Sequence, residues 1–206
     1  MTAEMSKSGL STRDIVRVGM FAAFLAVMSQ LSVPLPGGVP VTIQVFAVAV
    51  VGAALGSKLG ALAVLVYILV GAVGMPVFAN FRGGLEVLAG TSGGYIIGWP
   101  FMALLCGLSQ KITLRPAGRK ADVSRESTGR RRSIAAVVLS VIPALVGLAI
   151  VECLGGLWWS VIAGGNLREI MIYSLAAFIP KDIVITILGL FFGRQLRRLL
   201  NRVSGV

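Results

Sequence analysis

Histidine is absent from this sequence, and charged residues make up only 13% of its 206 positions. Without imidazole, histidine-based proton transfer and histidine metal ligation are both excluded. A soluble domain of this length carries about 25% charged residues. The scarcity of charge, together with a mean hydropathy of +0.91, therefore excludes an ordinary soluble domain and predicts an integral membrane protein.

Cysteine is also scarce, because Cys106 and Cys153 are the only two in the chain and each lies inside an apolar run. Two thiols in such positions are typical of small buried residues rather than of a disulfide framework or a metal site. We therefore expect both side chains to be buried, and we predict no metal and no cofactor.

Acidic residues number eight against 19 lysines and arginines, which gives a net charge of +11. In a soluble protein this excess would indicate nucleic-acid binding. Here the positive residues lie in loops and tails beside apolar segments, where they are typical of membrane topology signals and of contact with anionic lipid. We predict no nucleic-acid partner.

Long apolar segments predict an all-α membrane protein with six transmembrane helices in a single domain, residues 1–206. The helices are expected at about 15–32, 41–55, 59–75, 93–108, 134–157 and 170–192. At ~1.5 Å per residue the second reaches about 23 Å, short of the ~30 Å hydrocarbon core. We therefore expect polar protein or water at its start, beside Thr42 and Gln44. The first apolar run leads directly into more membrane sequence, so no removable signal peptide is expected.

Positive residues also predict the orientation. The segment 111–133 is expected to be a basic cytoplasmic linker between helices four and five. With both termini in the cytoplasm, 16 of the 19 lysines and arginines lie inside, and the others are Arg82, Arg168 and Lys181. Short loops rich in Lys and Arg stay in the cytoplasm. We predict cytoplasmic N- and C-termini in a multi-pass protein of the inner (cytoplasmic) membrane.

The stretch 71–95 interrupts the apolar pattern with seven glycines, a proline and the polar residues Asn80, Arg82 and Glu86. Irregular backbone at membrane depth is tolerated only where it is buried in protein or lines a polar cavity. The sequence therefore predicts an irregular outer loop over 76–92 that lines a small-molecule site, with the segment 180–182 as its partner.

Charged residues gather on the predicted outer side, together with Glu152 in the outer part of helix five. They are Arg82, Glu86, Arg168, Glu169, Lys181 and Asp182. Ionisable groups in a membrane face the protein interior or water and are functional-site candidates. Pro180 predicts the first turn of a helix, with Asp182 favourably placed near the positive end of the dipole. The alternative is that Pro180 kinks helix six and Asp182 pairs with Lys181 or Arg82 for structure.

Aromatic and small residues leave two alternatives open. The aromatic residues near the outer side could either line a ligand pocket or belong to an interfacial aromatic belt. They are Phe78, Phe81, Tyr95, Trp158 and Trp159. In the first helix, Ala22 and Ala26 lie four apart, with Gly19 and Ala23 one position away. Small residues at this spacing let another helix approach closely in lipid, either from a partner or within the same bundle.

Several longer motifs resemble those of one family. They are Pro-Leu-Pro at 34–36, PVTIQ at 40–44, GAVGMPVFANFRGG at 71–84, GTSGGYIIGWP at 90–100 and AAFIPKDIV at 176–184. Over about 13–110 and 134–193 the sequence resembles the BioY family, the biotin-binding S-components of energy-coupling factor (ECF) vitamin transporters.

The resemblance implies six helices with cytoplasmic termini and a biotin pocket open to the outside. The implied substrate-binding residues are Gln44, Asn80, Arg82, Gly83, Tyr95, Lys181 and Asp182. Asp182 matches the family's acidic residue that would bind the polar end of biotin. The pair Ala22 and Ala26 resembles the motif by which S-components meet the transmembrane coupling subunit, which in turn carries two ATP-binding cassette ATPases.

Two positions depart from the family pattern. Family members usually carry glycine before the acidic residue and lysine three residues after it, whereas this chain has Lys181 and Ile185 there. The cation that meets the carboxylate of biotin is therefore either Lys181 or Arg82. In addition, Thr91-Ser92 stands where Pro-Thr is usual.

The hypothesis from the sequence is high-affinity biotin capture for ATP-driven uptake. The chain contains no Gly-x4-Gly-Lys-Ser/Thr phosphate loop, so we predict a binding subunit and not an enzyme. One alternative is an S-component for another vitamin, such as thiamine or riboflavin. A second is an intramembrane enzyme that uses Asp182 with Glu86 or Glu152.

Overall fold

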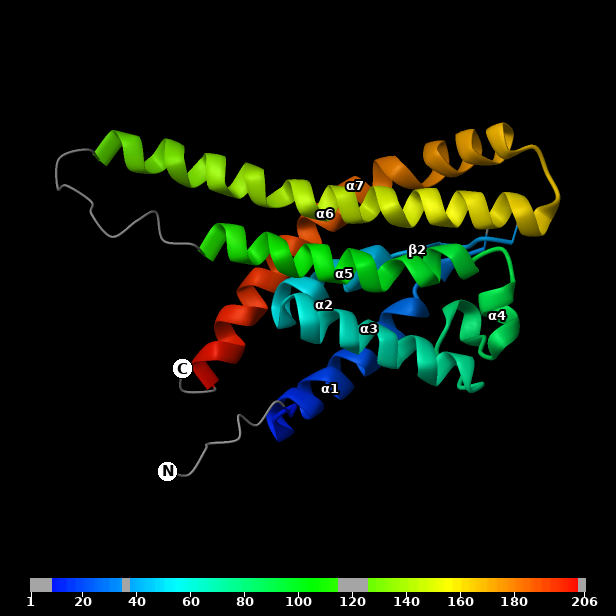
Figure 1. Cartoon of the computed structure of the whole chain (residues 1–206), viewed down its shortest axis with the longest axis horizontal. Helices are drawn as coiled ribbons and strands as arrows, with labels where there is room; N and C mark the ends of the chain where they lie inside the picture. Colours follow the sequence, from blue (N-terminus) through cyan, green and yellow to red (C-terminus); the bar gives the residue numbers. More distant parts are fainter. Residues whose placement is uncertain (1–8, 35–37, 115–125, 204–206) are drawn as a thin grey trace, which may run out of the picture.

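The structure is a computed structural model that describes residues 9–34, 38–114 and 126–203. Within these ranges the chain forms a helical bundle (Figure 1). The helices are α1 (Thr12–Ser29), α2 (Gln44–Leu55), α3 (Ser57–Ala72), α4 (Leu85–Ala89), α5 (Gly93–Leu114), α6 (Glu126–Ala163) and α7 (Leu167–Val203). A 3-10 turn, η1 (Ala79–Phe81), precedes α4, and two short strands, β1 (Ser32–Val33) and β2 (Val41–Thr42), pair as an antiparallel ribbon.

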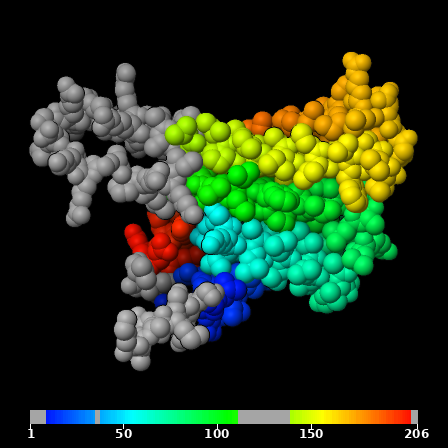
Figure 2. Space-filling view, in the orientation of Figure 1, coloured from blue at the N-terminus to red at the C-terminus, as the bar shows by residue number. Residues whose placement is uncertain are grey.

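The long helices lie side by side as layers. In the space-filling view α6 lies above α5, and α5 lies above α3, with α1 at the lower edge (Figure 2). The start of α1 and the end of α7 lie at one end of the bundle, while α4 and β2 lie toward the other (Figure 1). The ribbon and the segment around α4 therefore belong to the same end of the molecule.

Helix α2 is the centre of the packing. From Val45 to Ala54 every residue except Phe46 is buried, and α2 contacts α1, α3, α5 and α7. Neighbouring helices therefore surround α2. Gly56, with φ +87°, joins α2 directly to α3 in a conformation that glycine adopts without strain.

By length and apolar composition, two described helices qualify as membrane spans, within Leu139–Ala163 and Leu167–Arg202. Helices α2 and α3 are apolar but shorter. Each of the six predicted segments overlaps one of the longer helices, and the five-residue α4 lies in the segment predicted to be irregular. The count of six membrane crossings stays a prediction.

The prediction that Pro180 begins a helix is wrong. Helix α7 begins at Leu167, where the Asn166 side chain accepts a hydrogen bond from the backbone N–H of Arg168 at 3.0 Å. Pro180 lies inside α7, where it has no N–H to donate and its ring crowds the preceding turn. Figure 1 shows α7 changing direction along its length, as the alternative interpretation of Pro180 anticipates.

Two further expectations differ from the structure. Helix α5 continues to Leu114 and α6 begins at Glu126, so both enter the predicted linker 111–133, of which 115–125 lies outside the described residues. Cys106 is buried as expected, but Cys153 is exposed on α6. An apolar run in a membrane protein supplies lipid-facing as well as core-facing positions, so its apolarity does not distinguish the two.

Candidate functional site

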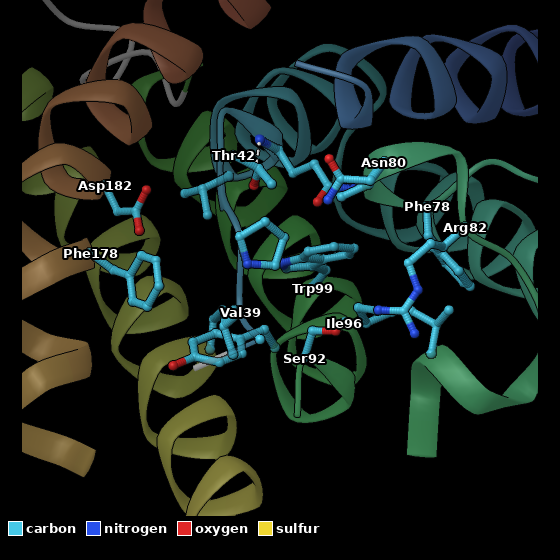
Figure 3. A pocket seen from close by; sticks show the side chains of 18 of the residues that line it. Val39, Thr42, Phe78, Asn80, Arg82, Ser92, Ile96, Trp99, Phe178 and Asp182 are labelled. Carbon is cyan, nitrogen blue, oxygen red and sulfur yellow. Dashed lines mark hydrogen bonds between the residues drawn. The ribbon is translucent and has the colours of Figure 1, made fainter. Parts of the chain in front are cut away.

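A cavity of about 870 Å³, including its open mouth, lies at the end of the bundle that holds the ribbon. Five parts of the chain line it: the ribbon with the start of α2, the segment 78–92, the start of α5, the middle of α6 and the middle of α7. Figure 3 shows side chains from these parts converging on one space.

The irregular segment is held in shape by hydrogen bonds from the residues that follow α1. The Gln30 side chain donates to the carbonyl of Phe78 at 3.2 Å and accepts from the backbone N–H of Phe81 at 2.9 Å. Asn80 and Phe81 both have positive φ, at 59° and 55°, which non-glycine residues adopt only when surrounding contacts require it. Ser32 donates to the Asn80 side-chain oxygen at 3.0 Å. These contacts place Asn80 and Arg82 at the cavity.

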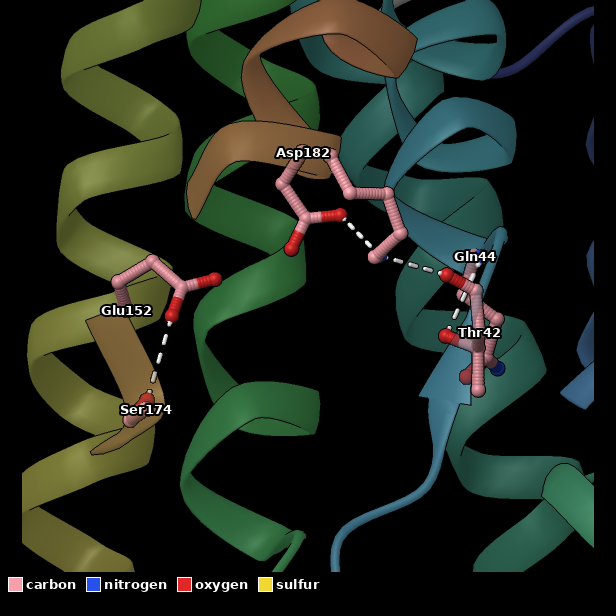
Figure 4. Close-up of polar contacts among 6 residues, drawn as sticks. Thr42, Gln44, Glu152, Ser174 and Asp182 are labelled. Atoms are coloured by element: carbon pink, nitrogen blue, oxygen red, sulfur yellow. Dashed lines mark hydrogen bonds and ion pairs between the residues drawn. The ribbon is translucent and has the colours of Figure 1, made fainter. Parts of the chain in front are cut away.

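Lys181 joins Asp182 to the ribbon in the wall of the cavity. The Lys181 ammonium donates to the Thr42 carbonyl at 2.9 Å and forms an ion pair with the Asp182 carboxylate (Figure 4). Asp182 is only 2% exposed. The ion pair therefore connects α7 to β2 and places one carboxylate in the wall of the cavity.

Glu152, from α6, is a second buried carboxyl group in the same cavity, and it is also 2% exposed. The Ser174 hydroxyl lies 3.5 Å from its Oε2 and 2.6 Å from the Tyr95 hydroxyl. The sequence placed Glu152 among the outer polar residues but not in the substrate-binding set. Its signal was that of a lone acidic residue in a long apolar segment.

A second polar chain runs behind the cavity. Gln44 donates to the Tyr67 hydroxyl at 2.8 Å, and that hydroxyl donates to the Val77 carbonyl at 3.1 Å. Tyr67 is 1% exposed. It was not anticipated, because an isolated tyrosine in an apolar helix resembles many packing residues. These hydrogen bonds fix the side chain of Gln44, which lines the cavity.

Aromatic rings form much of the apolar wall. Phe78, Tyr95, Trp99 and Phe178 line the cavity, and the Tyr95 and Phe178 rings make an edge contact at 5.8 Å between centroids. Trp99 was missed, although it follows Tyr95 by four residues and so lies on the same face of α5.

The other aromatic candidates lie elsewhere. Trp158 donates its ring N–H to the Gly90 carbonyl at 3.0 Å, and Trp159 packs on Tyr173. Phe81 is 72% exposed. None of the three lines the described cavity, so their part in walling a ligand is not supported by the geometry.

The structure brings six of the seven predicted substrate-binding residues to one cavity. They are Gln44, Asn80, Arg82, Tyr95, Lys181 and Asp182. Gly83 does not line it; a side chain at this position would collide with the backbone of Met75. Gly83 therefore permits a close approach of two backbone segments, which supports the shape of the site from outside.

The predicted docking pair, Ala22 and Ala26, packs against the chain's own bundle, and its role in docking stays a prediction. Ala22 is 8% exposed and Ala26 is partly buried against the core. Gly19 and Ala23 are exposed on the adjoining, outward face of α1. Ala22 and Ala26 thus contact the chain's own bundle, and the small residues open to a partner are Gly19 and Ala23.

Known proteins similar to this chain come from one family. Residues 1–202 match the BioY family. The chain is 48% identical over 96 residues to the biotin transporter BioY of Thermotoga maritima, covering 47% of this chain and 56% of that protein. It is 33% identical over 175 residues to the probable biotin transporter BioY of Pyrococcus horikoshii, covering 85% of this chain and 90% of that protein.

One solved structure has a similar fold. It is a crystal structure of the S-component for biotin from an ECF-type ABC transporter, and it matches with a TM-score of 0.71 and 25% sequence identity. The match covers 92% of this chain and 95% of that one.

Proposed function

Because the chain belongs to the BioY family, we propose that it is the biotin-binding S-component of an energy-coupling factor transporter. The observation that carries this proposal is the cavity, in which buried carboxyl groups and an arginine lie among aromatic rings. Biotin has a cyclic urea at one end, an apolar thioether ring and alkyl chain, and a carboxylate at the other end. Each part has a matching surface in the cavity.

The two ends of the cavity differ in charge. Figure 3 shows Asp182 and Arg82 on opposite sides of the space. A carboxylate accepts the N–H groups of a urea, and a guanidinium binds a carboxylate. We therefore propose that biotin lies with its urea toward Asp182 and its carboxylate toward Arg82.

Arg82 fits the role of carboxylate ligand better than Lys181. Lys181 already holds the Asp182 carboxylate and the Thr42 carbonyl. The Arg82 guanidinium is exposed, and it has no hydrogen bond or ion pair with the part of the chain that the structure describes. Its five N–H donors are available to an incoming anion.

The remaining substrate-binding residues have narrower proposed roles. Gln44 and Asn80 supply amide groups at the cavity, and Tyr95 supplies a ring against which the bicyclic head packs. Gly83 acts indirectly, through the close approach it allows. No residue is assigned a catalytic role, because capture of an unmodified vitamin requires only binding.

The proposed topology has six crossings, formed by α1, α2, α3, α5, α6 and α7, with both termini in the cytoplasm. The excess of lysine and arginine at the termini and in the segment 111–133 supports it. In this orientation the cavity opens to the outer side of the inner membrane. A transmembrane coupling subunit and two ATP-binding cassette ATPases then supply the energy for release inside the cell.

Equilibrium dialysis of the purified protein with labelled biotin, thiamine and riboflavin tests the function. We expect tight binding of biotin and no binding of thiamine or riboflavin at the same concentration. Preferential binding of thiamine or riboflavin would overturn the assignment of biotin while leaving the S-component fold intact.

A further inference from the structure

Two carboxyl groups share the cavity, although only one is expected from the family resemblance. Glu152 on α6 and Asp182 on α7 both line the cavity and are each 2% exposed. Figure 4 shows the two carboxyl groups turned toward each other, and they lie within electrostatic interaction range. An acidic side chain inside a membrane protein is costly and needs compensation.

The described residues do not supply that compensation equally to the two acids. Asp182 has the Lys181 ammonium as an ion-pair partner. Glu152 has the Ser174 hydroxyl, at the long distance of 3.5 Å, and the Asp182 carboxyl group, with which it interacts by charge and a side-chain hydrogen bond. A carboxylate offers about four acceptor positions, so Glu152 keeps acceptor positions open beside its contacts with Ser174 and Asp182.

A purely structural role explains Glu152 poorly. The Tyr95 and Ser174 hydroxyls already bond to each other at 2.6 Å and so link α5 to α7 without the acid. The 3.5 Å contact adds little to that link, since hydrogen bonds between hydroxyl and carboxylate oxygens are normally 2.5–3.0 Å long. A donor from a ligand would occupy an acceptor position of Glu152 that faces the cavity.

We propose that Glu152 is a second ligand-binding residue, and that Glu152 and Asp182 each accept a hydrogen bond from one of the two ureido N–H groups of biotin. The proposal rests on the proposed function and extends it. A cyclic urea presents two N–H donors that diverge from one ring, and a pair of carboxyl groups from two helices can receive one each. The site therefore selects ligands by the number of N–H donors on their ring.

Biotin analogues methylated on one or the other ureido nitrogen provide the test, because each lacks one N–H group. Affinities for biotin and both analogues are measured with the wild-type protein, Glu152→Met, Asp182→Asn and the control Glu86→Gln. Glu86 is an exposed acid outside the described cavity lining. A thermal unfolding curve for each variant confirms that it is folded.

We expect Glu152→Met to weaken biotin binding by about 10- to 100-fold, the effect of losing a hydrogen bond to a charged group. The loss of affinity caused by methylation at one nitrogen should shrink at least fivefold in this variant and remain for the other nitrogen. Asp182→Asn should show the reverse pattern, and Glu86→Gln should behave as the wild type. If Glu152→Met does not fold, the near-isosteric Glu152→Gln carries the same comparison with a smaller loss of affinity.

Two results would overturn the proposal. If methylation costs as much in the Glu152 variants as in the wild type at both nitrogens, Glu152 does not contact the urea. If biotin affinity is unchanged in the Glu152 variants, Glu152 does not contribute to binding. A wild-type protein that fails to bind biotin at all would overturn the proposed function itself, which distinguishes the two failures.

Discussion

Lys181 occupies an unusual position, directly before the acid with which it pairs. Its side chain is 27% exposed, whereas that of Asp182 is 3% exposed. The Lys181 ammonium also donates to the Thr42 carbonyl, so one cation both neutralises a buried acid and ties α7 to the ribbon. Removing Lys181 should therefore affect folding as well as binding.

At the residue scale, we predict that Lys181→Met lowers the free energy of unfolding by about 1–3 kcal/mol, because it leaves Asp182 buried without its cation. The value is set below that of a fully buried pair because Lys181 is partly exposed. Thermal unfolding in detergent measures the change. The double variant Lys181→Met with Asp182→Asn is the control and should recover part of the loss; a double variant less stable than the single one would contradict the explanation.

A second prediction concerns Arg82 and the acid end of biotin. Arg82→Met should weaken biotin binding by about tenfold or more, because the guanidinium no longer pairs with the carboxylate. Binding of biotin amide, which has no carboxylate, should be almost the same in the variant and the wild type. Arg168→Met, at an exposed arginine outside the described lining, serves as the control. Equal weakening of both ligands by Arg82→Met would assign the carboxylate to another residue.

At the scale of elements, helix α2 depends on close contact with α5. Gly52 faces α5 where a side chain would overlap the backbone of Ala103 and press on Cys106. By contrast, Gly19 on α1 has open space at the corresponding position. These two glycines therefore serve different purposes, although both lie within apolar helices.

We predict that Gly52→Val forces α2 and α5 apart and destabilises the protein by about 1–3 kcal/mol, the usual cost of overpacking. Gly19→Val is the matched substitution and should leave the unfolding temperature almost unchanged. The comparison of the two unfolding temperatures is the measurement. Equal effects at the two positions would show that the contact between α2 and α5 is not a constraint.

The elements also show what the sequence could and could not predict. Apolar runs located the six longer helices because lipid requires continuous apolar segments of about 20 residues, and glycines located the irregular segment. The ribbon was missed because β1 and β2 are two residues each. The outward face of α1 was missed because lipid and protein core are both apolar, so apolarity cannot tell Ala22 from Ala23.

The candidate site was predicted in a similar way. Polar residues are rare in an apolar chain, so Asn80, Arg82 and Asp182 stood out, and the fold brings them to one cavity. The proximity of Glu152 to Asp182 depends on how α6 packs against α7, which no spacing within either helix reveals. The supporting contacts of Gln30 and Tyr67 were missed for the same reason.

At the scale of the whole molecule, the cavity and the exposed small residues of α1 lie on different parts of the bundle. Neither Gly19 nor Ala23 lines the cavity, and the face they share is apolar, with Val16, Met20 and Val27 all more than half exposed. Such a face suits contact with lipid or with another transmembrane helix. Binding of biotin and assembly with a coupling subunit should therefore be separable.

We predict that Ala23→Trp abolishes assembly with the transmembrane coupling subunit and the ATPases but leaves biotin affinity within about twofold of the wild type. A bulky side chain at Ala23 prevents another helix from approaching closely, and its distance in the fold from the cavity lining spares the ligand contacts. Co-purification with the tagged coupling subunit measures assembly, and dialysis measures binding. Val146→Trp, at a residue of α6 that is 47% exposed, is the control and should change neither assembly nor biotin affinity. Normal assembly of Ala23→Trp would place the partner on another face, whereas loss of biotin binding with it would show that α1 and the cavity are one cooperative unit.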